Sequence, residues 1–512
     1  MCRFIILALA FCAPAAAQTA SFETRVKAIM GRPEYRHSRF GMEFYSFEQD
    51  KILYAWNPQE LFIPGSTTKL LTVGTALELL GPDFRFHTKV YRAGTLDGST
   101  LNGDLVLVAG GDPDLSNRIQ PDGTLAFENE DHSYDGFAAA KPVPGDPLMV
   151  LRELAAKVAA SGVKRIEGRV RVDVSLFPEG ERELGTHVVI SPVVVNDNLV
   201  DVTVTPGREG DAPVLTISPQ TGYVTIRNQV MTGAAGGKTE FRWIRDIANP
   251  DGTRSVTLSG TIPAGAKPRL RVYKVPMPSR FAEVVFAEVL LSAGIQIDGR
   301  ELTAERVLKE EFVVAEHVSP PLREEAKVTL KVSQNLHAST LPYILGAYLS
   351  KMPSEDPQSD GFRAEGEMLR KADLDLTGAA QNDGAGGAAL FAPDFMVHFL
   401  LHLTRQAFFP NFLKSLPVLG KDGTLYDIQT ESPAAGHVFA KTGTFGGGNA
   451  LTGGGVVDAK GLAGFVDTKS GHRLIFAAYI NFVPFADMNE ESTRSVGEAL
   501  GEIAAAAYED LP

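Results

Sequence analysis

The alternation of apolar and polar residues predicts a strand hairpin followed by a helix near the start of the chain. Residues 41–47 and 51–56 are typical of two strands joined by a short polar turn. Residues 70–80 then carry apolar side chains at helical spacing, until Gly81 and Pro82 stop the helix. A hairpin that leads directly into a helix fixes the direction in which side chains of the first helical turn point.

The pattern changes twice along the rest of the chain. Short β-type segments with Gly and Asp turns dominate residues 86–275, with one amphipathic helix predicted at 148–160. The predicted strands in that region include 101–108, 169–174, 200–205, 214–217 and 223–226. Helical spacing resumes at 281–292, which we take as the return to the first domain. A further helix is predicted at 336–349, and strands of one sheet at 436–444, 453–457 and 474–480.

This organisation predicts a discontinuous domain with an insertion. A chain of 512 residues is too long for one core. We assign residues 18–85 and 275–512 to an α/β (α+β) domain, and residues 86–274 to one or two inserted domains that are mainly β. The composition, 44% hydrophobic and 22% charged, is that of a soluble globular protein. The formal net charge of −13 argues against a nucleic-acid partner, because phosphate binding needs clustered Lys and Arg.

The first residues have the three parts of a secretory signal peptide. A basic start is followed by an apolar run at 4–12 and by small residues, of which Ala15 and Ala17 bracket a cleavage site. We predict that residues 1–17 are removed and that the mature protein is periplasmic, with no integral membrane anchor. Cys2 and Cys12 both lie in this segment, so no disulfide is expected in the mature chain.

Three short motifs carry groups that suit nucleophilic catalysis. The first places the Ser66 hydroxyl one helical turn before the Lys69 amine. A serine hydroxyl is a poor nucleophile until a neighbour takes its proton, and a lysine kept neutral by burial or by another cation can take it. Ser333 and Asn335 follow at a turn between two helices, and Lys441-Thr442-Gly443-Thr444 lies on a predicted strand. Each motif alone is weak evidence, but together and in this order they indicate one catalytic site.

The strand motif should present different groups on its two faces. Strand alternation places Lys441 and Gly443 on one side, and Thr442 and Thr444 on the other. Gly443 has no Cβ, so we expect that a ligand could approach the backbone there.

Two other motifs are better explained without a ligand. His398 and His402 have the spacing of a metal site on a helix, but Phe399 stands where the zinc-protease motif needs glutamate, and no third ligand is evident. The glycines of residues 110–113 are followed by no lysine at phosphate-loop spacing, so a tight turn after a strand is expected. We therefore predict no metal site and no cofactor.

With its three motifs together, the sequence resembles the penicilloyl-serine transferases, which include the serine β-lactamases and the penicillin-binding proteins. Within that group it is similar to the D-alanyl-D-alanine carboxypeptidase/endopeptidase family, the low-molecular-mass class C penicillin-binding proteins. The stretches that carry this resemblance are Gly103-Asp104-Leu105, Gly110-Gly111-Asp112-Pro113, Val195-Asn196-Asp197-Asn198, Ser319-Pro320-Pro321-Leu322 and Asp383-Gly384-Ala385-Gly386. The resemblance covers nearly the whole mature chain and implies a penicillin-binding/serine β-lactamase-like transpeptidase domain with a long insertion.

The resemblance also implies an activity and roles for residues. The substrate would be the stem peptides and cross-links of peptidoglycan, and β-lactams would bind covalently. Ser66 would be the acylated nucleophile, and Lys69 its general base. Ser333 would relay a proton to the leaving D-alanine, while Asn335 orients the substrate amide and Lys69.

The strand motif would hold the substrate carboxylate. Lys441 would supply positive potential and help to keep Lys69 neutral, while Thr442 and Thr444 donate hydrogen bonds to the carboxylate beside Gly443. The backbone N–H groups of Ser66 and Thr444 would form the oxyanion hole.

The sequence departs from the family pattern at two places, and two alternatives stay open. Gln334 stands where Asp is usual, and residues 383–388 lack two serines, which bears on substrate preference.

A class A β-lactamase would need a Glu-x-x-x-Asn loop, but Glu365 and Glu367 are followed at that spacing by leucine and lysine. The other alternative is a non-catalytic homologue that binds or senses the cell wall.

Overall fold

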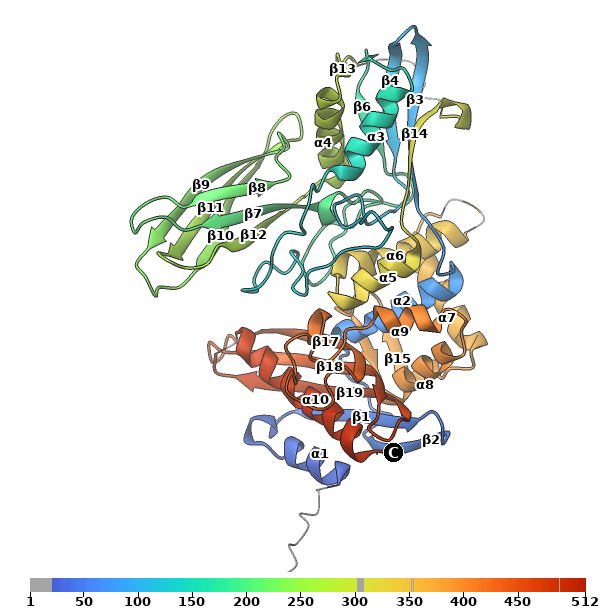
Figure 1. The fold of residues 1–512 in the computed structure, drawn as a ribbon, viewed down its shortest axis with the longest axis vertical. Coiled ribbons are helices and arrows are strands. Elements are labelled where there is room, and N and C mark those ends of the chain that lie inside the picture. Colours follow the sequence, from blue (N-terminus) through green and yellow to red (C-terminus); the bar gives the residue numbers. More distant parts are fainter. Residues whose placement is uncertain (1–20, 302–307, 351, 353, 488) are drawn as a thin grey trace, which may run out of the picture.

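A five-stranded antiparallel sheet forms the base of the molecule in the computed structural model (Figure 1), which describes residues 21–301, 308–350, 352, 354–487 and 489–512. The predicted signal peptide, with Cys2 and Cys12, lies outside these residues. The strand order is β17–β18–β19–β1–β2, with β1 at Arg39–Ser46, β2 at Lys51–Trp56, β17 at Val438–Gly448, β18 at Gly455–Asp467 and β19 at Arg473–Phe485. The predicted hairpin is confirmed as β1 and β2, and the three C-terminal strands belong to one sheet as predicted.

The alternation along β19 explains how this sheet is buried on both faces. Phe476 and Ile480 point to the side covered by α1 (Phe22–Met30) and α10 (Glu490–Asp510). Ala477 and Tyr479 point to the other side and pack with the helical half of the domain. Because side chains alternate with a period of two, one strand joins two separate cores.

A buried helix, α2 (Thr68–Leu79), lies at the centre of that helical half. It is buried along most of its length, its polar residues Lys69, Thr72 and Thr75 included, so it is enclosed by other helices. These are α5 (Leu322–Lys331), α6 (Asn335–Leu349), α7 (Pro357–Lys371), α8 (Pro393–Thr404) and α9 (Phe409–Ser415), with a two-stranded sheet of β15 (Ala379–Gln381) and β16 (Ala389–Phe391) beside them. The helices predicted at 70–80 and 336–349 are confirmed as α2 and α6.

The inserted region forms two lobes. One, above the helical half in Figure 1, is a sheet with the order β13–β5–β4–β3–β14, to which β6 is added beside β4 and against which α3 and α4 pack. Its elements are β3 (His87–Asp97), β4 (Thr100–Val108), α3 (Met149–Ala160), β5 (Arg165–Ile166), β6 (Val170–Asp173), α4 (Pro278–Ser292), β13 (Gln296–Ile297) and β14 (Val313–Val318).

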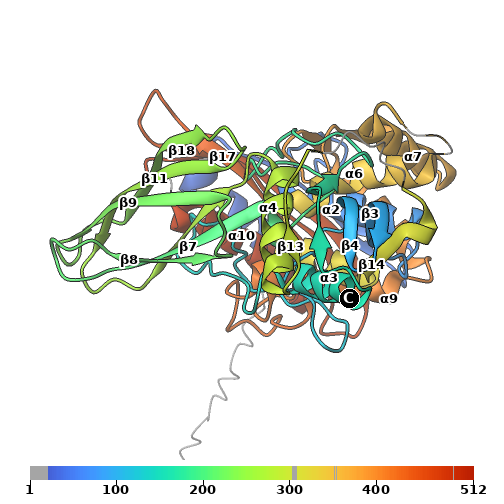
Figure 2. The same cartoon turned by 90° about the horizontal axis from the view of Figure 1, so that it is seen from above.

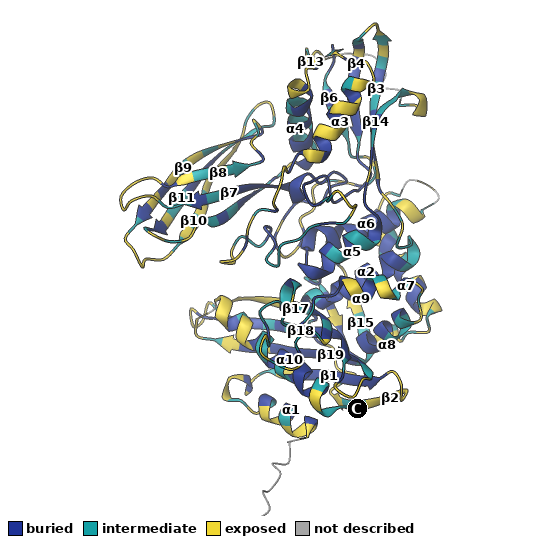
Figure 3. Cartoon of the chain, viewed as in Figure 1, coloured by how far each residue is buried: buried dark blue, intermediate teal, exposed yellow. Residues whose placement is uncertain are grey.

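The second lobe projects sideways as an arm of two three-stranded sheets, visible from two directions in Figures 1 and 2. The sheets have the orders β12–β7–β8 and β10–β11–β9 and share a small apolar core. The strands are β7 (Leu199–Thr205), β8 (Val214–Ser218), β9 (Val224–Gly233), β10 (Glu240–Ala248), β11 (Arg254–Pro263) and β12 (Arg269–Lys274). Figure 3 shows how much of the arm is exposed, in contrast to the buried strands β1 and β19.

The position of α4 differs from the sequence-based prediction. Periodicity assigns residues 281–292 to the first domain, but Phe281 and Phe286 are buried in the core of the insertion with α3 and β4. β14 also pairs with β3, far earlier in the chain. An amphipathic helix shows which of its faces is buried but not what buries it. We therefore propose that the insertion runs from β3 to β14, instead of ending at residue 274.

Among the described residues, no helix combines the length and the hydropathy that a membrane-spanning helix requires.

The packing of α4 leads to a test of this boundary. Phe281→Ala removes a fully buried ring, and we expect it to lower the free energy of unfolding of the inserted lobe by about 3–5 kcal/mol. Hydrogen exchange followed by mass spectrometry should show faster exchange in α3, β4 and β6, with little change in β17–β19. Faster exchange mainly in β17–β19 would indicate that α4 belongs to the first domain.

Candidate active site

Ser66 lies in a short 3₁₀ turn, η2 (Gly65–Thr67), directly before α2. Lys69 follows one turn later, and its Nζ lies 2.7 Å from the Ser66 Oγ. This contact is dictated locally, because residues three apart in a helical turn share one face. The Lys69 side chain is completely buried, whereas Ser66 lines an open cavity.

The Lys69 amine is surrounded by oxygen atoms from distant segments. Its Nζ lies 2.6 Å from Asn335 Oδ1, 3.3 Å from Ser333 Oγ and 3.3 Å from the carbonyl oxygen of Ala385. Burial lowers the pKa of Lys69 to about 7, although Asp383 and Glu183 act in the opposite direction. A substantial fraction of neutral amine is therefore present near neutral pH, which suits a general base.

Ser333 occupies the turn between α5 and α6 in a left-handed conformation, with φ of 63°. For a residue other than glycine, such a conformation costs on the order of 1–3 kcal/mol, so surrounding contacts must hold it. Gln334 supplies one: its Oε1 accepts a hydrogen bond from the Leu336 N–H at 2.8 Å and caps α6. Its Nε2 donates to Asp131 of the insertion at 3.3 Å. Glutamine therefore serves as a helix cap here.

The strand motif lies on β17 with the predicted alternation. Thr442 and Thr444 line the cavity that contains Ser66, whereas Lys441 is fully buried. The Lys441 Nζ donates to the Thr442 carbonyl at 2.9 Å. Burial lowers the pKa of Lys441 well below its usual value, and the nearby ammonium groups of Lys69 and Lys460 lower it further.

The glycines of this region let β17 pack directly on the nucleophile turn. A Cβ at Gly443 would lie 2.1 Å from the Pro64 carbonyl oxygen, and one at Gly65 would lie 2.8 Å from the Thr444 nitrogen. The space that a Cβ at Gly443 would occupy is therefore filled by the protein's own backbone, and contact of a ligand with the Gly443 backbone stays a prediction. The close approach brings the backbone nitrogens of Ser66 and Thr444 to one junction.

The Asp383 loop supports the site through its backbone. Its carboxylate accepts hydrogen bonds from the N–H groups of Ala385, Gly386 and Ala388 at 2.7–3.0 Å. This turn directs the Ala385 carbonyl towards Lys69. A Cβ at Gly386 would lie 2.0 Å from the Gly65 carbonyl oxygen, so the loop also packs beneath the nucleophile turn.

The cavity has a volume of 830 Å³, and part of its wall comes from the insertion. Tyr134 and Gly185 lie on that wall, and a Cβ at Gly185 would be 2.0 Å from Asn335 Nδ2. Lys460 also lines the cavity and donates to Thr444 Oγ1 at 2.8 Å. No sequence motif marks these three residues. Knowledge of the register would have identified Lys460, since it is the cross-strand partner of Thr444.

The candidate histidine pair has separate partners. His402 Nε2 lies 2.8 Å from Glu78, whereas His398 Nδ1 contacts Asp394 on the same helix. Neither histidine lines the cavity of Ser66.

Comparison with known proteins places this site in a family. The model of the D-Ala-D-Ala carboxypeptidase 3 (S13) family matches residues 22–505. The chain belongs to this family. Its members are serine-type hydrolases, and the predicted fold class is confirmed along with the family resemblance.

Individual relatives cover most of the chain. A D-alanyl-D-alanine carboxypeptidase of Actinomadura sp. (strain R39) is 28% identical over 473 residues, which is 87% of this chain and 80% of the relative. The D-alanyl-D-alanine carboxypeptidase DacB of Haemophilus influenzae is 23% identical and covers 90% of this chain and 88% of its own. The crystal structure of penicillin binding protein 4 (dacB) from H. influenzae superposes with a TM-score of 0.73 at 21% identity, covering 94% of this chain and 98% of its own.

The surroundings of Lys69 predict how acylation depends on pH. Glu183 raises the pKa of Lys69, so Glu183→Gln should lower it and let the neutral amine form at lower pH. In the pH profile of the rate of acylation by a chromogenic β-lactam, the ascending limb should therefore move to lower pH. Glu181→Gln is a matched control that should leave the limb in place, because Glu181 is paired with Tyr343. A limb that moves to higher pH in Glu183→Gln would exclude Lys69 as the titrating group.

Proposed function

We propose that this protein is a periplasmic D-Ala-D-Ala carboxypeptidase and DD-endopeptidase that acts on peptidoglycan through an acyl-enzyme on Ser66. The observation that carries the proposal is the contact between the Ser66 hydroxyl and the buried amine of Lys69 within a member of the S13 family. A solved relative, penicillin binding protein 4 of H. influenzae, is described in complex with a β-lactam, which supports β-lactam binding here.

In the acylation step, Ser66 Oγ attacks the carbonyl carbon of the penultimate D-alanine while Lys69 accepts the hydroxyl proton. The negative charge of the tetrahedral intermediate is held by the N–H groups of Ser66 and Thr444, an interaction of about 3–4 kcal/mol per donor in a serine protease. Ser333, 3.3 Å from Lys69, relays the proton to the departing amine. That amine belongs to the terminal D-alanine in the carboxypeptidase reaction, and to the neighbouring stem peptide in the endopeptidase reaction.

The contacts of Asn335 support its assignment to orientation. Its Oδ1 accepts a hydrogen bond from Lys69, which leaves the Nδ2 donor for a substrate carbonyl. In deacylation, water attacks the ester carbonyl and gives its proton to Lys69. The bond to Ser66 Oγ then breaks, and Lys69 passes that proton to the serine oxygen.

The substrate carboxylate requires cationic and hydroxyl groups on the cavity wall. Thr442 and Thr444 supply hydroxyls, but Lys441 is fully buried. Lys460 lies on the wall beside Thr444, and burial lowers its pKa to about 8, so most of it is charged at neutral pH. We therefore assign the direct ionic contact to Lys460, while Lys441 acts through the local potential.

The β-lactamase alternative has less support. Glu365 is buried on α7, and neither Glu365 nor Glu367 lines the Ser66 cavity. These residues therefore cannot activate a water molecule at the acyl-enzyme as the class A mechanism requires.

The main test uses a purified cross-linked muropeptide, with products identified by mass. The mature protein should release D-alanine from pentapeptides and cleave D-Ala cross-links, whereas Ser66→Ala should fold but lose both activities by more than 10³-fold. Loss of penicillin labelling in the same variant is the control for the nucleophile. A fully active Ser66→Ala protein would show that another residue is the nucleophile. If penicillin labelled the wild-type protein but no muropeptide were cleaved, the non-catalytic alternative would be favoured.

The fate of a penicillin adduct separates the peptidase from the β-lactamase. A β-lactam opens on Ser66 without losing its amine half, so the tethered leaving group hinders the approach of water. We expect intact-mass spectrometry to show an adduct that persists for minutes or longer. Rapid hydrolysis of penicillin with no accumulating adduct would contradict the peptidase assignment.

The assignment of Lys460 predicts a defect that depends on the substrate carboxylate. Lys460→Met should raise KM for a D-Ala-D-Ala peptide roughly tenfold, since a hydrogen bond to a charged group is lost. For the same peptide with a C-terminal amide in place of the carboxylate, KM should scarcely change. Lys421 does not line the cavity, so Lys421→Met is the matched control. An equal increase in KM for the acid and the amide would show that Lys460 does not bind the substrate carboxylate.

A further inference from the structure

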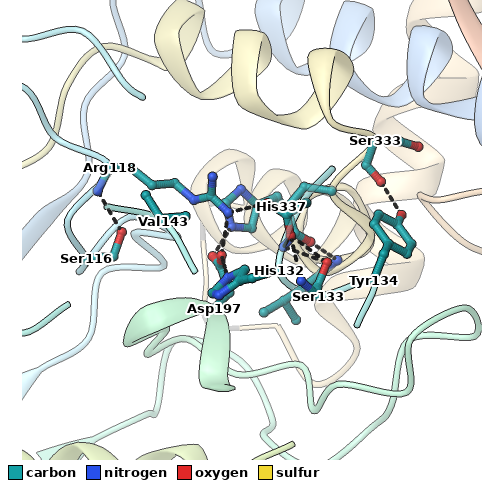
Figure 4. A network of polar contacts seen from close by, with 12 residues as sticks. Ser116, Arg118, His132, Ser133, Tyr134, Val143, Asp197, Ser333 and His337 are labelled. Carbon is teal, nitrogen blue, oxygen red and sulfur yellow. Dashed lines mark hydrogen bonds and ion pairs between the residues drawn. The ribbon is translucent and has the colours of Figure 1, made fainter. Parts of the chain in front are cut away.

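A segment of the insertion, residues 131–134, reaches the turn that carries Ser333 and Asn335. The Tyr134 hydroxyl lies 2.6 Å from the Ser333 carbonyl oxygen and 3.0 Å from Asn335 Oδ1. Figure 4 shows the tyrosine side chain directed at Ser333. Both neighbours accept, so the single hydroxyl proton is shared between them. Burial raises the pKa of Tyr134 well above its usual value, and Glu183 and Asp131 raise it further, so the hydroxyl stays a donor.

These two acceptors are the parts of the turn that need to be fixed. Ser333 has a left-handed backbone, and the orientation of its peptide decides whether its Oγ points to Lys69. The Asn335 Oδ1 that Tyr134 contacts is the same atom that accepts from Lys69. One hydroxyl therefore restrains both residues of this turn that touch the general base, Ser333 through its backbone carbonyl and Asn335 through its side chain.

A buried ion-pair network holds the segment in place. Asp131 and Asp197 both accept from Arg118 Nη2, at 2.5 and 2.6 Å. His132 lies between Asp197 and Asp201, at 2.6 and 2.9 Å. All five side chains are buried, and Arg118, His132 and Asp197 are drawn together in Figure 4.

The same network is joined to the catalytic helix. His337, in the first turn of α6, lies 2.7 Å from Asp197 and 2.8 Å from Glu325 of α5. Burial lowers the pKa of His337, but Glu325 and Asp197 outweigh it and raise the pKa well above the usual value. The cation thus joins α5 and α6 to the segment that carries Tyr134, so the tyrosine and the turn are fixed to one rigid frame.

From this geometry we propose that Tyr134 is a positioning residue for acyl transfer, which holds Ser333 and Asn335 in register with Lys69 and makes the insertion part of the active site. The inference rests on the proposed function. The competing role is that of a wall residue, because the Tyr134 ring also lines the cavity. The two roles differ in which kinetic constant depends on the hydroxyl.

The test is Tyr134→Phe, which keeps the ring and removes only the hydroxyl. We expect the single-turnover acylation rate constant for a chromogenic β-lactam at saturation to fall roughly tenfold, as for one lost hydrogen bond. The concentration giving half-maximal rate should change less than twofold. Both constants are independent of the folded fraction, so partial unfolding cannot imitate the result.

Tyr348→Phe is the matched control, since the Tyr348 hydroxyl also donates to a backbone carbonyl, that of Gly110, at 2.7 Å. It should acylate like the wild type. The proposal would be overturned if Tyr134→Phe left the saturating acylation rate constant unchanged, whether or not the half-maximal concentration rose. Tyr134 would then be a wall residue only. If the wild type formed no adduct on Ser66, the proposed function itself would fail, which is a separate outcome of the same experiment.

Discussion

The site depends on one physical constraint, the complete burial of the Lys69 amine. A fall in pKa from 10.5 to about 7 means that the protein disfavours the ammonium form by about 5 kcal/mol relative to water. The carboxylates of Asp383 and Glu183 act against this effect, since each negative charge favours the ammonium form. Desolvation prevails because the amine is fully removed from water. The lysine is thereby available as a base without a histidine.

Burial of this kind requires three distant segments to close around one nitrogen atom. η2 brings Ser66, the turn before α6 brings Ser333 and Asn335, and the Asp383 loop brings a carbonyl. The glycines at the junction of β17, η2 and the loop allow these backbones to approach. The buried ion pairs between the insertion and α6 extend the same frame. Removing one partner from such a pair leaves an uncompensated charge, which commonly costs 3–5 kcal/mol, so the insertion and the catalytic half are tightly coupled.

The sequence was informative where chemistry and local structure coincide. The spacing of Ser66 and Lys69 is fixed by a helical turn. The alternation on β17 put Thr442 and Thr444 on one side of the strand, and the structure shows that this side lines the cavity. Contacts set by tertiary packing were not predictable. Tyr134 and Ser333 are 199 positions apart, and their segments carry no common pattern. Periodicity found α4 but assigned it to the wrong core. The close approach of the Pro64 carbonyl oxygen to Gly443 was not predictable for the same reason, because tertiary packing sets it.

The most direct measurement is the titration of the Lys69 amine itself. Protein labelled with ¹³C at lysine Cε can be followed by NMR over a range of pH, and the Lys69 resonance can be assigned from its absence in Lys69→Arg. The account predicts a midpoint near 7, far below those of the exposed lysines. A midpoint near 10 would show that Lys69 is an ordinary ammonium group at neutral pH, and it would contradict the assignment of this residue as the general base.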